Sequence, residues 1–189
     1  MTTIVVVKKN RIAAIAADSL TTFGNTRLSH VYDAAPEKIL QHENTYIALA
    51  GSAAHHLVIS SMLRRRNGLN FGGTVEIYDT FRKMHPVLKQ DHFLNPREQE
   101  DDPYESSQLT VLIANKTGVY GVYSMREVFE YSKFWAIGSG RDFAMGAMYT
   151  VYDQLASAEE IARVGVQAGC EFDTDSALPI NVYTVPLDK

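Results

Sequence analysis

The second residue of the chain, Thr2, is the first candidate for a reactive group. If Met1 is removed, Thr2 carries a hydroxyl group and a free α-amine on the same residue. A hydroxyl group is a weak nucleophile, and an N-terminal amine is one of the bases that activate it in enzymes. The α-amine has a pKa of about 7.7–8 in model peptides, so it accepts a proton near neutral pH. The start of the chain therefore allows hydrolysis by an N-terminal threonine, although Met-Thr starts are also common in other proteins.

Two charged residues lie where predicted strands begin or end. Asp18 follows the apolar residues 12–17, and Lys38 opens the predicted strand 38–40. Asp18 is either a turn-forming residue or a functional group at the end of a strand. Lys38, by its position alone, is a solvent-exposed strand residue. Neither residue indicates a particular chemistry without further evidence.

Length and composition exclude several classes of protein. The chain has 189 residues and a net charge of −4, so we expect one domain over residues 1–189 and no nucleic-acid partner. Its one cysteine cannot form an internal disulfide, which fits a reducing compartment. We find neither a run of about 18 apolar residues nor a signal peptide. We therefore expect a cytoplasmic protein, without a membrane partner, in which removal of Met1 alone exposes Thr2.

Predicted strands and helices alternate in blocks along the sequence. The first two strands, residues 2–7 and 12–17, are apolar on both faces, so both faces of their sheet must be covered. The other predicted strands are residues 38–40, 45–50, 109–114, 118–123, 128–131, 134–137 and 180–185, and the four between 109 and 137 form a meander. Four helices are predicted to begin after Ser52, at Thr74, at Arg141 and at Ala158, and to end near Arg66, Gln90, Gln154 and Gly169. This order predicts an α+β fold, a four-layer α-β-β-α sandwich.

Three segments carry local signals. Residues 22–26 are predicted to form a loop with a Gly-Asn turn. Pro86 is expected to end or kink the second helix. Residues 91–107, which contain two prolines and an acidic run, are predicted to form a solvent-exposed loop. The spacing of the acidic residues matches none of the known metal-binding loops.

Six short motifs, in order, resemble the proteasome β-subunit family and, within it, the HslV-type peptidases. The motifs are Met1-Thr2-Thr3-Ile4-Val5, Asp18 followed by Phe23-Gly24-Asn25-Thr26, Lys38-Ile39, Ala50-Gly51-Ser52-Ala53-Ala54, Ala136-Ile137-Gly138-Ser139-Gly140, and Asp173-x-x-Ser176 before Ile180-Asn181-Val182-Tyr183. The stretch between Thr26 and Lys38 and the acidic segment 91–105 are longer than in HslV. These extensions resemble a divergent branch from betaproteobacteria. His55 stands where the family usually has Asp.

The resemblance implies a role for each matching residue. Thr2 would be the nucleophile, Lys38 would lie buried beside it, and Asp18 would pair with Lys38, because an unpaired buried charge is very costly. Gly51 would donate its backbone N–H to the oxyanion. The residues expected around the α-amine are Ser139, Asp173 and Ser176. The residues expected to bind substrate are Thr22, Leu49 and Ala53.

The resemblance also implies partners. No cofactor is expected for catalysis, but the backbone carbonyls of Cys170, Asp173 and Ser176 match positions that hold a structural cation, Na, K or Mg, in the family. The chain is expected to form a homo-oligomer of two stacked rings of six or seven subunits, which degrades unfolded proteins or peptides. A ring ATPase of the HslU type is a possible partner. Two alternatives remain open, an N-terminal-nucleophile amidohydrolase that is not a peptidase and a ring-forming scaffold without activity.

Overall fold

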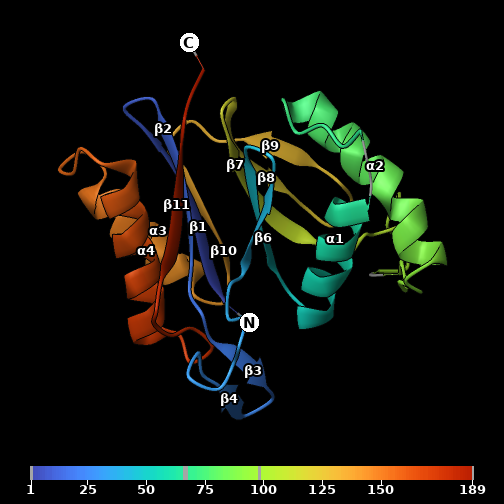
Figure 1. Cartoon of the computed structure of the whole chain (residues 1–189), viewed down its shortest axis with the longest axis horizontal. Coiled ribbons are helices and arrows are strands. Elements are labelled where there is room, and N and C mark those ends of the chain that lie inside the picture. The colour runs from blue at the N-terminus through green and yellow to red at the C-terminus, as the bar shows by residue number, and fades with distance from the viewer. Residues whose placement is uncertain (1, 66–67, 98, 189) are drawn as a thin grey trace.

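The computed structural model describes residues 2–65, 68–97 and 99–188, in which two large antiparallel sheets lie between two pairs of helices (Figure 1). The α+β, four-layer α-β-β-α sandwich expected from the sequence is confirmed. Two residues named in the predictions, Met1 and Arg66, lie outside the described residues. Within the described ranges, no helix is both long and apolar enough to cross a membrane.

The first sheet contains both of the apolar strands at the start of the chain. Its strand order is β10 (Phe134–Gly138), β1 (Thr3–Lys9), β2 (Ile12–Ala17) and β11 (Asn181–Pro186). Side chains on one face, including those of Val5 and Ala16, pack against helices α3 (Arg141–Val151) and α4 (Ala158–Phe172). The opposite face packs against the second sheet. Strands β1 and β2 are apolar on both faces because both faces are buried.

The second sheet has the strand order β5 (Ile39–His42), β6 (Thr45–Ala50), β7 (Thr110–Asn115), β8 (Gly118–Val122) and β9 (Val128–Glu130). Its outer face packs against α1 (Ala53–Arg65) and α2 (Thr74–Gln90) through residues such as Ile59, Phe81 and Ile113. Ser52 directly precedes α1, and its hydroxyl accepts a hydrogen bond from the backbone N–H of Ala54 at 3.3 Å. This second core attaches the α1–α2 layer to the sandwich.

The predicted four-strand meander is wrong in its last strand. Strands β7, β8 and β9 are consecutive neighbours, but β10 leaves them and pairs with β1 in the other sheet, with Ile137 opposite Ile4. Along β10, Ala136 packs against the α3–α4 side and Ile137 against the sheet-to-sheet core. Because both of these side chains need buried partners, β10 is stable only in a sheet that is covered on both faces.

Other boundaries also differ from the predictions. Pro86 does not end α2, because the proline is exposed while Met84 and Leu88 continue the buried stripe that holds the helix against the sheet. Helix α3 ends at Val151 rather than near Gln154. The loop predicted at 22–26 is instead a small hairpin of β3 (Thr21–Phe23) and β4 (Thr26–Leu28). This hairpin lies beyond the end of the two large sheets (Figure 1).

Helix α4 continues past its predicted end at Gly169 because that glycine is a packing residue. A Cβ atom added at Gly169 would lie 2.2 Å from Thr3 Oγ1 and 2.6 Å from Thr3 Cγ2. At Gly165, one turn earlier, an added Cβ would lie 2.8 Å from Met148 Cγ. The two glycines therefore let α4 approach both α3 and the start of β1, next to Thr2.

We predict that Gly169→Ala destabilises the protein by about 1–3 kcal/mol, the usual cost of overpacking a core. Gly146→Ala is the matched control, because an added Cβ on this α3 glycine meets nothing within 4 Å. The control should be neutral or stabilising by about 0.5–1 kcal/mol, from helix propensity alone. Chemical denaturation of the two variants measures both effects. Equal stabilities would show that α4 does not depend on this close approach.

Candidate active site

Three residues predicted to act together meet at the start of β1. The Thr2 hydroxyl donates a hydrogen bond to Asp18 Oδ1 at 2.5 Å, and Lys38 Nζ lies 3.1 Å from Thr2 Oγ1. Lys38 Nζ also donates to Asp18 Oδ1 at 2.9 Å. Thr2 is at the start of β1, Asp18 follows β2, and Lys38 precedes β5, so both large sheets contribute to the cluster.

The Asp18 carboxylate is fully buried and has a complete set of donors. Oδ1 accepts hydrogen bonds from Thr2, Lys38 and the backbone N–H of Thr3, the last at 3.0 Å. Oδ2 accepts from the backbone N–H groups of Leu20 at 3.0 Å and Ala177 at 3.2 Å. A buried carboxylate is tolerated when it is paired and hydrogen-bonded in this way. Asp18 therefore does more than form a turn, since it joins three distant segments of the chain.

Lys38 is not the exposed strand residue that its position alone suggests. Its side chain is 15% exposed, and the expected ion pair with Asp18 is present. The pair places a positive charge directly beside Thr2 Oγ1. Such a charge stabilises negative charge that develops on this oxygen when it attacks a carbonyl.

Ser139, Asp173 and Ser176 form a second set of hydrogen bonds around residues 2 and 3. The Thr2 backbone nitrogen donates to Ser139 Oγ at 3.3 Å, and Ser139 donates to Asp173 Oδ2 at 2.7 Å. Ser176 also donates to Asp173 Oδ2, at 2.6 Å. The recorded contact of Ser176 with the start of the chain is to Thr3 Oγ1, at 2.7 Å. Ser139 and Asp173 thus line up with the nitrogen of Thr2, while Ser176 supports the next residue.

The sequence analysis assigned no role to Thr3, which the structure places at the centre of this support. Thr3 is fully buried, and it bonds to Asp18 through its backbone N–H and to Ser176 through its hydroxyl. Gly140 and Gly169 approach Thr3 so closely that an added Cβ on either would lie about 2 Å from Thr3 Oγ1, at 2.0 and 2.2 Å. Because this role arises from packing, only the threonine pair in the sequence could have suggested it.

Gly51 and Thr2 line the same cavity, which has a volume of about 550 Å³. Gly51 has a φ angle of +125°, in the region that favours glycine, while the space around it is open. Its backbone conformation, more than a lack of room, explains the glycine at this position. The cavity gives the hydroxyl of Thr2 a route to a ligand although Thr2 itself is only 4% exposed.

The three predicted substrate-binding residues do not line this cavity. Thr22 lies on β3, where it pairs with Arg27 of β4. Leu49 lies on β6 and is partly buried against the α1–α2 core, and Ala53 is the exposed first residue of α1. They lie on separate elements, and their role in substrate binding stays a prediction.

Cys170 lies in the last turn of α4, close enough to Asp18 and Lys38 for their charges to affect it. Burial, followed by the nearby Asp18 charge, raises the pKa of its thiol to about 12, so this thiol is not a competing nucleophile. Carbonyl oxygens at a helix end lack helical partners and suit hard cations. The Asp173 carbonyl already accepts the Ser176 N–H at 3.3 Å. Within the described ranges, no cluster of side chains has the composition of a metal site.

Two adjacent histidines in the first turns of α1 bury ring nitrogens without a hydrogen-bond partner within the described part of the chain, His55 Nδ1 and His56 Nε2. Burial lowers the pKa of both rings, and the positive charge of Lys38 lowers that of His56 further. Both rings are therefore neutral at neutral pH. The dependence on Lys38 places His56 within electrostatic reach of the Thr2 cluster.

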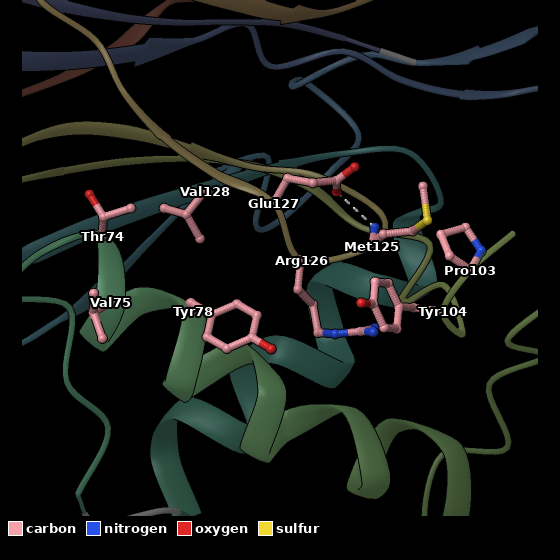
Figure 2. Close-up of a pocket in the computed structure, with 9 residues that line it drawn as sticks. All are labelled: Thr74, Val75, Tyr78, Pro103, Tyr104, Met125, Arg126, Glu127 and Val128. Carbon is pink, nitrogen blue, oxygen red and sulfur yellow. Dashed lines mark hydrogen bonds between the residues drawn. The ribbon is translucent and has the colours of Figure 1, made fainter.

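A second cavity, of about 490 Å³, does not include Thr2 in its lining (Figure 2). It is lined by the start of α2, residues 103–104 and the segment that joins β8 to β9. Val75, Tyr78 and Val128 make it largely apolar, and none of the residues that contact Thr2 lines it. This cavity is therefore separate from the Thr2 cluster.

We predict that Asp18→Asn destabilises the protein by about 3–5 kcal/mol, because it leaves Lys38 without its buried partner and presents an NH₂ group to backbone donors. Asp79→Asn is the control, since it removes a carboxylate from an exposed ion pair with Arg82. We expect the control to change stability by less than about 1 kcal/mol. Urea denaturation of both variants compares them directly. An Asp18→Asn protein with the stability of the unmodified protein would contradict the central role of this carboxylate.

We also predict that His56 makes the protein less stable in mild acid. Its pKa is lower in the folded chain than in the unfolded chain, where it is about 6.5, so the unfolded chain binds more protons below that pH. The free energy of unfolding therefore falls as the pH drops through and below 6.5. His56→Asn should reduce this loss between pH 7.5 and 5.5, whereas His92→Asn, at an exposed position, should not. Identical pH profiles for the protein and His56→Asn would contradict the prediction.

Comparisons with known proteins agree with this geometry. The family model described as proteasome subunit matches residues 1–185. A comparison with curated proteins finds no match. Among solved structures, the bacterial proteasome homologue (BPH) of Thiobacillus denitrificans in complex with epoxomicin is 36% identical with a TM-score of 0.92, covering 99% of this chain and 100% of that chain.

A second structure of Thiobacillus denitrificans BPH is 37% identical with a TM-score of 0.92, covering 98% of each chain. Eukaryotic HslV from Trypanosoma brucei is 17% identical with a TM-score of 0.67, covering 97% of this chain and 99% of that chain, and so shares the fold. Members of this family assemble into rings of several subunits. The chain belongs to the proteasome subunit family, whose members are N-terminal threonine peptidases.

Proposed function

We propose that this chain is a threonine endopeptidase whose nucleophile is the Thr2 hydroxyl and whose base is the Thr2 α-amine, exposed when Met1 is removed. The observation that carries the proposal is the position of Thr2 Oγ1, within 2.5 Å of Asp18 Oδ1 and 3.1 Å of Lys38 Nζ. A hydroxyl held beside a paired lysine in a water-accessible cavity has the arrangement of an activated nucleophile.

The reaction would proceed through a covalent ester. Thr2 Oγ attacks the carbonyl carbon of a peptide bond and its proton moves to the α-amine, through one water. The α-amine then gives the proton to the leaving nitrogen as the C–N bond breaks, which leaves the acyl group on Thr2. Water hydrolyses this ester by the same proton transfers in reverse and regenerates the hydroxyl. Throughout these steps the Lys38 ammonium, held by Asp18, offsets the negative charge on Oγ.

Two groups of residues would support these steps. The Gly51 N–H would bind the oxyanion, an interaction worth about 10²–10³ in turnover. Ser139 and Asp173 would orient the amine and its water, and Ser176 would hold Thr3. The serine and aspartate contacts around residues 2 and 3 provide the fixed geometry that such proton transfer needs.

The remaining assignments concern ligands. Thr22 and Ala53 would form backbone hydrogen bonds with a peptide substrate, which would bind as an added strand. Leu49 and Ala53 would form the wall of a specificity pocket. The carbonyl oxygens of Cys170, Asp173 and Ser176 would hold a structural Na, K or Mg ion at the end of α4. Such an ion would fix this turn, and no step of the reaction uses it.

By analogy with the family, the active subunit would be part of two stacked rings of six or seven copies in the cytoplasm. Enclosing the sites would limit cleavage to peptides and unfolded proteins that can enter. A ring ATPase of the HslU type would supply such chains. The Thiobacillus denitrificans relative was solved with epoxomicin, which makes a peptide epoxyketone a suitable probe for this chain.

The decisive experiment combines this probe with two substitutions. Intact-mass analysis should show a protein without Met1 that gains the mass of one epoxyketone at Thr2, since the adduct requires both the hydroxyl and the free amine. Thr2→Ala should lose labelling and at least about 10³-fold in peptide hydrolysis. Thr2→Ser is the matched control and should keep both, because serine retains the two reacting groups.

Four results would contradict the proposal. Retention of Met1 in the purified protein would remove the base. Unchanged hydrolysis by Thr2→Ala would show that another residue is the nucleophile, and failure of the protein to hydrolyse any peptide or react with the probe would favour a scaffold. A monomer or dimer by light scattering, with activity only on small amides, would favour a non-peptidase amidohydrolase.

A further inference from the structure

The cavity beside Thr2 has an aromatic wall to which the mechanism above assigns no role. Besides Thr2, Gly51 and Ser139, the lining includes Trp135 of β10 and Tyr123, which follows β8. Trp135 is 37% exposed, an unusual amount for an indole ring in the middle of a strand. Its exposed surface contributes to the cavity.

Hydrogen bonds and stacking fix this wall in place. The Trp135 indole N–H donates to Tyr123 Oη at 2.8 Å, and the hydroxyl groups of Tyr123 and Tyr131 lie 2.9 Å apart. The rings of Tyr131 and Trp135 are stacked, with centroids 5.1 Å apart and planes 10° from parallel. Phe129 meets the Tyr123 ring edge-on, at 5.7 Å. The polar atoms of the wall are already bonded to one another, so the part of the wall that lines the cavity offers a ligand mainly apolar ring surface.

The chemistry identifies the side of the substrate that this cavity receives. The leaving nitrogen must take a proton from the group that acted as base. In the proposed mechanism that base is the Thr2 nitrogen, which points to Ser139, and Ser139 lines the cavity. The other residues expected to bind substrate, Thr22, Leu49 and Ala53, lie outside it. The cavity therefore holds the part of the peptide that follows the cleaved bond.

We propose that Trp135, supported by Tyr123, selects a large apolar or aromatic residue immediately after the scissile bond. This inference rests on the proposed threonine peptidase function and adds a specificity that the function alone does not require. A volume of about 550 Å³ is within the usual range for small-ligand sites, about 300–1,000 Å³, and leaves room for one large side chain with its backbone. A ring already held in its bound position loses little conformational entropy when a partner stacks on it.

The test uses internally quenched peptides that share one acyl-side sequence and differ only in the residue after the cleaved bond, which is Phe, Leu or Gly. Mass spectrometry of the products confirms the cleavage position. Epoxyketone labelling of Thr2 is measured in parallel, because this probe adds to the Thr2 hydroxyl and amine without a scissile bond and so has no residue after one. The variants are Trp135→Ala, Trp135→Phe and, as a control, Tyr149→Ala, which removes an exposed aromatic ring of α3 outside the cavity.

We expect the protein to cleave the Phe peptide with a kcat/KM about tenfold or more above that of the Gly peptide, the discrimination that one buried side chain typically provides. Trp135→Ala should lower this ratio about tenfold, while the epoxyketone labels Thr2 at the rate measured for the unmodified protein. Trp135→Phe should keep most of the preference, and Tyr149→Ala should keep all of it. The ratio within each variant is independent of any loss of folded protein.

The outcomes separate the two proposals. Equal cleavage of the Phe and Gly peptides, or an unchanged ratio in Trp135→Ala with normal labelling, overturns the inference and leaves the peptidase function intact. Absence of labelling and of all cleavage in the unmodified protein overturns the function, and the inference with it.

Discussion

The buried carboxylate of Asp18 is the constraint on which the rest of the structure depends. With no exposed surface, it must receive its hydrogen bonds from the protein, and it receives five, from Thr2, Thr3, Leu20, Lys38 and Ala177. An unmet bond to a buried charge would cost several kcal/mol, so these segments cannot move independently. The same contacts that satisfy the carboxylate place a lysine beside the Thr2 hydroxyl. Stability and the proposed chemistry therefore share one set of bonds.

The sequence predicts the layers well, because the evidence for them is local. Apolar runs at residues 2–7 and 12–17 require a sheet covered on both faces. The residues that begin α4 are a local Ser-x-x-Glu signal, in which the Ser157 hydroxyl accepts the Glu160 N–H. The predictions that are wrong depend on contacts between residues far apart in the sequence. Whether β10 follows β9 or joins β1 depends on which sheet offers it a core. Likewise Gly169 resembles a helix end until Thr3 is seen against it.

In the candidate site, too, local motifs are predictable from the sequence and contacts between distant residues are not. Motifs that resemble the family identify Thr2, Asp18 and Lys38, and the structure brings these residues within hydrogen-bonding distance of one another. The sequence gives no sign of the Trp135–Tyr123 wall and only the adjacent threonines as a hint of the role of Thr3, since each arises where separate segments of the chain meet. Aromatic residues in a strand are usually core residues, and only the structure shows that Trp135 is partly exposed and lines the cavity.

The contacts of residues 173–177 with the start of the chain have a consequence for biosynthesis. Ser176 bonds to Thr3 and the Ala177 amide bonds to Asp18, across separations of 173 and 159 residues. A ribosome releases the N-terminal strands long before it has made these late residues. Until they emerge, the Asp18 carboxylate lacks a donor and Thr3 lacks its support, so the growing polypeptide has no completed site. The candidate site is thus completed only when residues 173–177 fold against the start of the chain.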